Sequence, residues 1–138
     1  MNRKIKSSER PAHKEILGKI SKARALLTET GYLAADPRKL ASNFYELELF
    51  TEQEQLDALR AAAAEIRPEY YVGGRPPARS YERATTGADL FAFGWMSEHF
   101  ERRMYFKFCL LACESGRPPD LYVFSLHEDR STRTRRKS

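Results

Sequence analysis

Residues 101–112 read ERRMYFKFCLLA, a stretch in which apolar and polar side chains alternate. In an extended strand, successive side chains point to opposite faces of the sheet. One face of this strand would carry only apolar side chains, which are Met104, Phe106, Phe108 and Leu110. The opposite face would carry Arg103, Tyr105, Lys107 and Cys109. The stretch therefore predicts a strand that covers a core with one face and presents a mostly polar row on the other.

Two further runs have the composition of strands. They are ADLFAFGWM at 88–96 and DLYVFSLHE at 120–128, both rich in aromatic and aliphatic residues. The connections SEHF and ACESGRPP are short and polar, which suits hairpins. The sequence therefore predicts an antiparallel meander in the C-terminal half.

The N-terminal half carries three helix patterns. Residues 13–30 show apolar side chains at helical spacing. Asp36-Pro37 is a typical helix start, and Thr51 with Glu54 forms a capping box before an alanine-rich helix that ends near residue 67. Helices followed by strands predict an α+β fold, with N-terminal helices packed on a small C-terminal antiparallel β-sheet.

The length of 138 residues suits a single domain that folds without a metal or a disulfide. We expect a basic flexible N-terminus at 1–11, one α+β domain at 12–129 and a basic flexible tail at 130–138. Cys109 and Cys113 have no second pair and no histidine at zinc spacing, so both are expected to be packed thiols. No apolar run has the length of a membrane helix and no secretory signal precedes the domain, so the expected location is the cytoplasm.

The formal net charge of +5 is concentrated at the two ends of the chain. Residues 1–10 carry +3 and residues 130–138 carry +5, whereas residues 11–129 carry −3. Basic arms on a neutral or acidic domain are typical of contact with a polyanion. The candidate RNA contacts in the tail are Arg130, Arg133, Arg135 and Arg136. The alternative is that these ends only keep the protein soluble.

The polar row of 101–112 is the candidate catalytic site. Arg103, Tyr105 and Lys107 would lie about 6 to 7 Å apart along one face, a spacing that suits a phosphate. His127, at the end of the last strand, carries an imidazole that in its ordinary state titrates near neutral pH and can act as an acid or a base. The alternatives are a solvated outer sheet face and a hydrogen-bonded histidine at a strand end. The histidines are scattered and no cluster has ligand spacing, so no metal and no cofactor are expected.

A loop at 69–87, rich in glycine, proline and arginine, is the second candidate site. Its candidate RNA-binding residues are Arg75, Arg79, Tyr81 and Arg83. Arginines interleaved with an aromatic ring suit the phosphates and bases of single-stranded RNA. A plain solvated connection and a surface for an acidic partner are the alternatives.

The order of several motifs carries a resemblance over residues 12–129. They are DPRKLASNFYELELFTEQEQLDAL, LFAFGW, MYFKF and YVFSLHED, with Tyr105-Phe106-Lys107 and Phe124-Ser125-Leu126 as the close local matches. In this order and pattern the chain resembles the MqsR toxins of the RelE-like superfamily of bacterial mRNA interferases. The resemblance implies a RelE-like fold, metal-independent cleavage of mRNA, free or on the ribosome, and a cognate antitoxin protein as partner.

The resemblance places the family's tyrosine at Tyr105 and its charged strand end near His127 and Arg130. A lysine and a glutamine of the family correspond here to Asp57 and to a position near Ala92. A similar fold is therefore better supported than an identical reaction. Two alternatives remain: a non-catalytic RNA-binding or ribosome-binding module of the same fold, and a regulatory protein-interaction domain whose basic ends bind a protein.

Overall fold

The computed structural model describes residues 13–74, 76–113 and 116–130. Within these ranges the helices are α2 (His13–Glu29), α3 (Pro37–Glu46) and α4 (Glu52–Glu65), with short 3₁₀ turns η1 (Pro68–Tyr70) and η2 (Arg83–Thr85). The strands are β1 (Leu33–Ala34), β2 (Phe91–Ser97), β3 (Arg102–Leu111) and β4 (Asp120–Glu128). The α+β class that the sequence predicts is confirmed.

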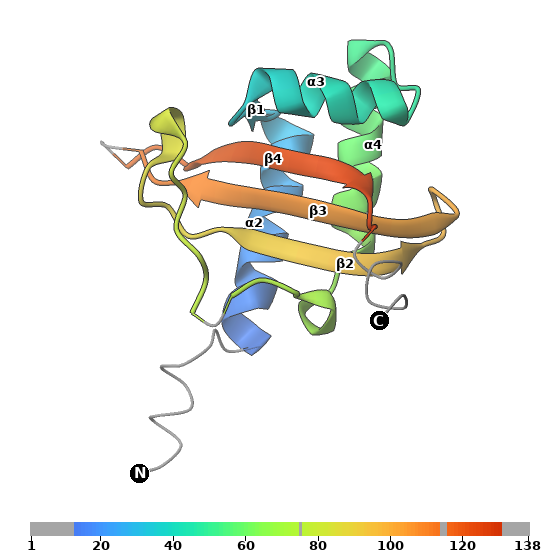
Figure 1. Cartoon of the computed structure of the whole chain (residues 1–138). Helices are drawn as coiled ribbons and strands as arrows, with labels where there is room; N and C mark the ends of the chain where they lie inside the picture. The colour runs from blue at the N-terminus through green and yellow to red at the C-terminus, as the bar shows by residue number, and fades with distance from the viewer. Residues whose placement is uncertain (1–12, 75, 114–115, 131–138) are drawn as a thin grey trace.

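The strands form one sheet in the order β1-β4-β3-β2 (Figure 1). β2, β3 and β4 are the predicted antiparallel meander. β1, which lies between α2 and α3 in the chain, pairs parallel to β4. The prediction of a purely antiparallel sheet after the helices is therefore wrong: the sheet is mixed, and a two-residue strand is too short to show a period in the sequence.

The core lies on one side of the sheet. Figure 1 shows α2 and α4 behind the strands, and no helix in front of β3. Phe93 and Phe106 from the sheet meet Ile20 and Leu59 from the helices, and all four side chains are 0% exposed. The apolar face of 101–112 is thus buried as the alternation predicts. No helix covers the opposite face, although the turn with Thr85 buries Cys109 at one end of it.

α2 and α4 are joined by arginines that bond to the last turn of the neighbouring helix. Arg24 Nε donates to the Ala63 carbonyl at 2.6 Å, and its Nη2 donates to the Ile66 carbonyl at 3.0 Å. Arg60 of α4 donates to the Leu27 carbonyl of α2 at 3.1 Å. Carbonyls at a helix end lack partners within the helix, and a cation is favourable there. These contacts hold the two helices in a defined register behind the sheet.

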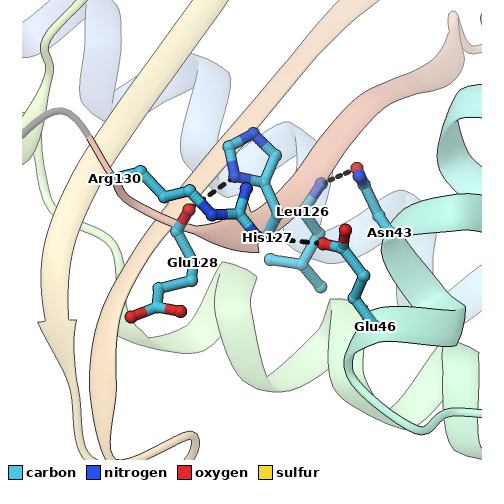
Figure 2. Close-up of polar contacts among 6 residues, drawn as sticks. All are labelled: Asn43, Glu46, Leu126, His127, Glu128 and Arg130. Carbon is cyan, nitrogen blue, oxygen red and sulfur yellow. Dashed lines mark hydrogen bonds and ion pairs between the residues drawn. The ribbon is translucent and has the colours of Figure 1, made fainter.

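α3 covers the edge of β4 where β1 ends. The Asn43 side-chain oxygen accepts a hydrogen bond from the Leu126 amide at 3.0 Å, and the last turn of α3 places Glu46 3.2 Å from Arg130 (Figure 2). Asn43 is 8% exposed, so its amide replaces a strand partner at a buried edge. α3 therefore covers this edge of β4.

Candidate functional site

The candidate site is the face of the sheet that points away from α2 and α4. β3 presents Arg103, Tyr105 and Lys107 there, at alternate positions. Tyr105 pairs across the strands with His127 of β4, and Lys107 pairs with Ser125. All the residues predicted as catalytic therefore lie on one face, in adjacent positions; their role stays a prediction.

A β-bulge between Lys107 and Phe108 shapes this face. Lys107 is opposite Ser125, whereas Phe108 is opposite Val123, so Phe124 has no partner on β3. The extra residue lies beside Lys107, whose Nζ atom is 5.7 Å from the centre of the Phe124 ring. The bulge therefore places an aromatic ring under the ammonium group.

The rings of Tyr105 and His127 are stacked, with centroids 5.2 Å apart and an interplanar angle of 26°. His127 Nδ1 lies 2.7 Å from the backbone carbonyl of Glu128 (Figure 2). A carbonyl only accepts hydrogen bonds, so Nδ1 carries the proton, and Nε2 of the neutral ring is an acceptor. Burial, and then the charge of Asp129, raise the pKa of Tyr105 above 10.0. At neutral pH the tyrosine is a donor beside this acceptor.

Arg103 is held at one end of the row. Its Nε is 3.9 Å from Asp129 Oδ2, and the Asp129 amide donates to the Arg103 carbonyl at 2.9 Å. Nε is buried and has no hydrogen-bond partner among the described residues. Gly94 leaves space for this pair, because a Cβ atom there would be 3.1 Å from Asp129 Oδ2 and 3.8 Å from Arg103 Nη2. The guanidinium is therefore positioned and retains a free donor.

Lys107 stands at the other end of the row. Burial, and then the nearby charge of Lys39 on α3, lower its pKa, while Glu82 from the turn at η2 acts in the opposite direction. Its cross-strand partner Ser125 is 1% exposed, and the Ser125 hydroxyl has no hydrogen-bond partner among the described residues. The face thus carries cations at both ends and the Tyr105–His127 pair between them.

The predicted RNA-binding residues are less concentrated. Arg79 forms an ion pair with Asp89 at 3.0 Å, Arg130 is paired with Glu46, and Arg83 lies exposed in η2. Tyr81 is 94% exposed. The other predicted contacts, which are Arg75, Arg133, Arg135 and Arg136, lie outside the described residues.

The turn that carries Tyr81 is ordered by buried hydroxyl groups. Ser80 and Thr85 share a hydrogen bond of 2.7 Å. Thr85 also bonds to Cys109, which anchors η2 at the end of β3. Figure 1 shows η2 beside this end of the sheet. Glu82, just before η2, acts on the pKa of Lys107, so the loop borders the open face at that residue. Burial raises the pKa of Cys109 to about 11, with the Thr85 bond acting in the opposite direction.

Both cysteines are free thiols. Cys109 is buried, as the sequence predicts, whereas Cys113 is half-buried. Within the described ranges, no group of three or more His, Cys, Asp or Glu residues is placed to hold a metal ion. Across the same residues, none of the helices combines the length and the apolar character that crossing a membrane requires.

Three residues of the site had no strong signal in the sequence. The charge of Lys39 on α3 acts on Lys107, Ser125 lies opposite Lys107, and Asp129 follows the last strand. The site also departs from the resembled family at two positions. Ala92 is the cross-strand neighbour of Lys107 on β2, and Asp57 is exposed on α4, where it accepts a bond from Gln53 at 2.8 Å.

Searches against protein-family models, curated proteins and solved structures found no match to this chain. The interpretation of the open face therefore depends on its own geometry.

Proposed function

We propose that this protein is an endoribonuclease that cleaves single-stranded mRNA without a metal, as the toxin of a bacterial toxin-antitoxin system. The observation that carries the proposal is the Tyr105–His127 pair, a donor stacked on an acceptor between two cations. Cleavage of an RNA strand by its own 2′-hydroxyl needs a base, an acid and positive charge at the phosphate.

Each proton in the proposed reaction has a defined place. His127 Nε2 accepts the proton of the ribose 2′-hydroxyl, and the 2′-oxygen forms a bond to phosphorus. The bond from phosphorus to the 5′-oxygen breaks, and this oxygen takes the proton of the Tyr105 hydroxyl. The products are a 2′,3′-cyclic phosphate and a 5′-hydroxyl end. Water then returns the proton from His127 to Tyr105, which resets the site.

Arg103 supplies the positive charge for the pentavalent phosphate. Its side chain is 40% exposed, and the ion pair between its Nε and Asp129 at 3.9 Å fixes the guanidinium. A positioned donor to developing negative charge contributes about 100-fold to 1,000-fold in rate. Lys107 holds the RNA backbone on the other side of the pair.

The RelE-like fold, the antitoxin and the cytoplasmic location belong to the same proposal. Helices on one side of the sheet, and an opposite face that no helix covers, would give RNA access to β3 and β4. An antitoxin protein would block cleavage by covering this face. Bases must be unpaired to lie on such a surface, so the substrate is single-stranded RNA.

A non-catalytic RNA-binding module is the second candidate. It is favoured by the 94% exposure of Tyr81 beside the open face, which suits base stacking, and by Ala92, where the resembled family has a glutamine. In this function the row would bind phosphates and no bond would break.

End mapping of RNA distinguishes the two candidates. Purified protein is incubated with RNA and a chelator, and new ends are sequenced and tested for a 5′-hydroxyl and a cyclic phosphate. His127→Gln and Tyr105→Phe should each reduce cleavage about 100-fold or more, as expected for loss of a general base or acid. Tyr122→Phe is the matched control, because Tyr122 pairs with Cys109 on the same sheet face, away from the pair. Folded wild-type protein that binds RNA but makes no new ends would leave only the binding module.

A further inference from the structure

α3 runs parallel to β4, and three contacts along their length define how the two elements are aligned. The Ala35 amide, just before the helix, donates to the Val123 carbonyl at 3.1 Å. Further along α3, the Asn43 side chain accepts a hydrogen bond from the Leu126 amide, and at the end of the helix Glu46 pairs with Arg130. Side chains four residues apart share a helix face. Lys39, one turn before Asn43, is therefore expected beside Phe124, at the edge of the open face.

Burial, and then the charge of Lys39 on α3, lower the pKa of Lys107 on β3. The Lys107 Nζ atom lies 5.7 Å from the centre of the Phe124 ring. The charge of Lys39 acts on the same ammonium group. Like charges close together disfavour the protonated state, and a bound anion removes this penalty. Glu82, on the η2 side, acts in the opposite direction but is a smaller cause than Lys39.

Ser125 adds a neutral donor at the same position. Its hydroxyl is buried and has no partner among the described residues, although it lies directly across from Lys107. Buried polar groups in proteins are nearly always hydrogen-bonded, so an unpaired hydroxyl calls for a ligand or a bound water. Two ammonium groups and a hydroxyl together match the oxygens of a phosphate.

We propose that Lys39, Lys107 and Ser125 form a second phosphate subsite, which holds the phosphate of the nucleotide adjacent to the cleaved bond. This inference rests on the proposed function. The subsite lies about 6.6 Å along the strands from the Tyr105–His127 pair, that is, two residues further on the same face. The substrate is then a strand with at least two consecutive phosphates in the site, and a dinucleotide leaves the subsite empty.

Binding is measured with RNA oligomers that carry 2′-O-methyl groups, which cannot be cleaved by this route. Fluorescence anisotropy over a salt series is compared for the wild type, Lys39→Gln and Arg38→Gln. Each phosphate neutralised on a single strand contributes about 0.7 to the slope of log affinity against log salt. Lys39→Gln should lower the slope by that amount, and Arg38→Gln, which removes the same charge from the neighbouring exposed position, should not. Equal slopes for the two variants would overturn the subsite.

Ser125→Ala separates a binding role from a structural one. The hydroxyl makes no hydrogen bond in the described protein, so its removal should leave the unfolding midpoint unchanged and weaken oligomer binding. Unchanged affinity would exclude Ser125 from the subsite.

Cleavage kinetics then test the position of the subsite. On a substrate with two phosphates, Lys39→Gln should raise KM about ten-fold, the scale of a hydrogen bond to a charged group, with kcat unchanged. On a dinucleotide with one phosphate, the variant should match the wild type. Equal KM changes on both substrates would place Lys39 at the cleaved phosphate and overturn the proposal. If no RNA is cleaved but Lys39→Gln still lowers the salt slope, the proposed function fails and the subsite stands.

Discussion

Gly94 leaves the space in which Arg103 and Asp129 meet, and this makes it a sensitive position of the site. A methyl group at Gly94 would be 3.1 Å from Asp129 Oδ2, closer than ordinary contact. We expect Gly94→Ala to displace the guanidinium and to lower kcat for RNA cleavage about 100-fold, the loss of one positioned donor. Gly18→Ala is the control. Gly18 lies at an exposed position of α2 where a Cβ atom would meet nothing within 4 Å, so the substitution should stabilise the protein by about 0.5–1 kcal/mol. Normal kcat in Gly94→Ala would show that Arg103 does not act on the phosphate.

Glu65 gives the fold a defined dependence on pH. Burial raises the pKa of this carboxyl, but bonds from Trp95 at 2.8 Å, from Ser97 at 2.7 Å and from the backbone at His99 and Glu98 lower it by more, so its pKa is below 4.5 in the folded state. A lowered folded pKa stabilises the protein above the unfolded value and loses this contribution as pH falls through the folded value. We expect the Tm of the wild type to fall as the pH decreases below about 4.5. Glu65→Gln should have a lower Tm than the wild type at pH 7, and its Tm should decrease less between pH 7 and pH 3. Thermal melts from pH 7 to pH 3 measure both, and parallel curves would contradict a role for Glu65.

At the scale of elements, Asn43 decides whether α3 stays against β4. Replacing it with alanine leaves the buried Leu126 amide without a partner, which should destabilise the protein by about 1–3 kcal/mol in urea unfolding. The neighbouring exposed Ser42, changed to alanine, should have a free energy of unfolding within about 0.5 kcal/mol of the wild type. Because Lys39 is on the same helix, Asn43→Ala should also weaken RNA binding. Equal stabilities of the two variants would show that packing, and not this bond, holds the helix.

The elements differ in how far the sequence could predict them. β4 has the bounds 120–128 that its composition suggests, and α4 begins after the predicted capping box, because both signals are local. β1 and the bulge at Lys107 depend on pairing with distant residues, and no local pattern encodes either. The prediction that Arg103, Tyr105 and Lys107 share one face of β3 is confirmed. The bulge follows Lys107 and so leaves the alternation of these three residues intact.

The site combines residues that local sequence patterns predict with residues that they do not. Alternation alone predicts which side chains of β3 share a face, and the strand end predicts His127. Lys39 belongs to the site only because α3 lies parallel to β4. Gly94 belongs to it only because β2 pairs with β3. Such partners follow from tertiary register, which a single sequence does not reveal.

The tail after Arg130 carries four basic residues and no acidic one. Arg130 is paired with Glu46 at the end of β4, so the chain leaves the domain close to His127 (Figure 2). Residues 131–138 carry +4, whereas residues 11–129 carry −3. A strand of RNA on the open face would therefore gain most of its remaining electrostatic attraction from this end. Deleting residues 131–138 should lower the salt slope of RNA binding by about 2, the value for three phosphate contacts.

Folding and cleavage at saturating RNA should be unchanged by this deletion, because the tail adds attraction and no catalytic group. The control is deletion of residues 1–10, which carry +3 at the other end of the sequence. Anisotropy over a salt series compares the two truncations with the full chain. If the slope does not change when residues 131–138 are removed, the tail makes no phosphate contacts, and the affinity for RNA comes from the open face and the loop of Tyr81 alone.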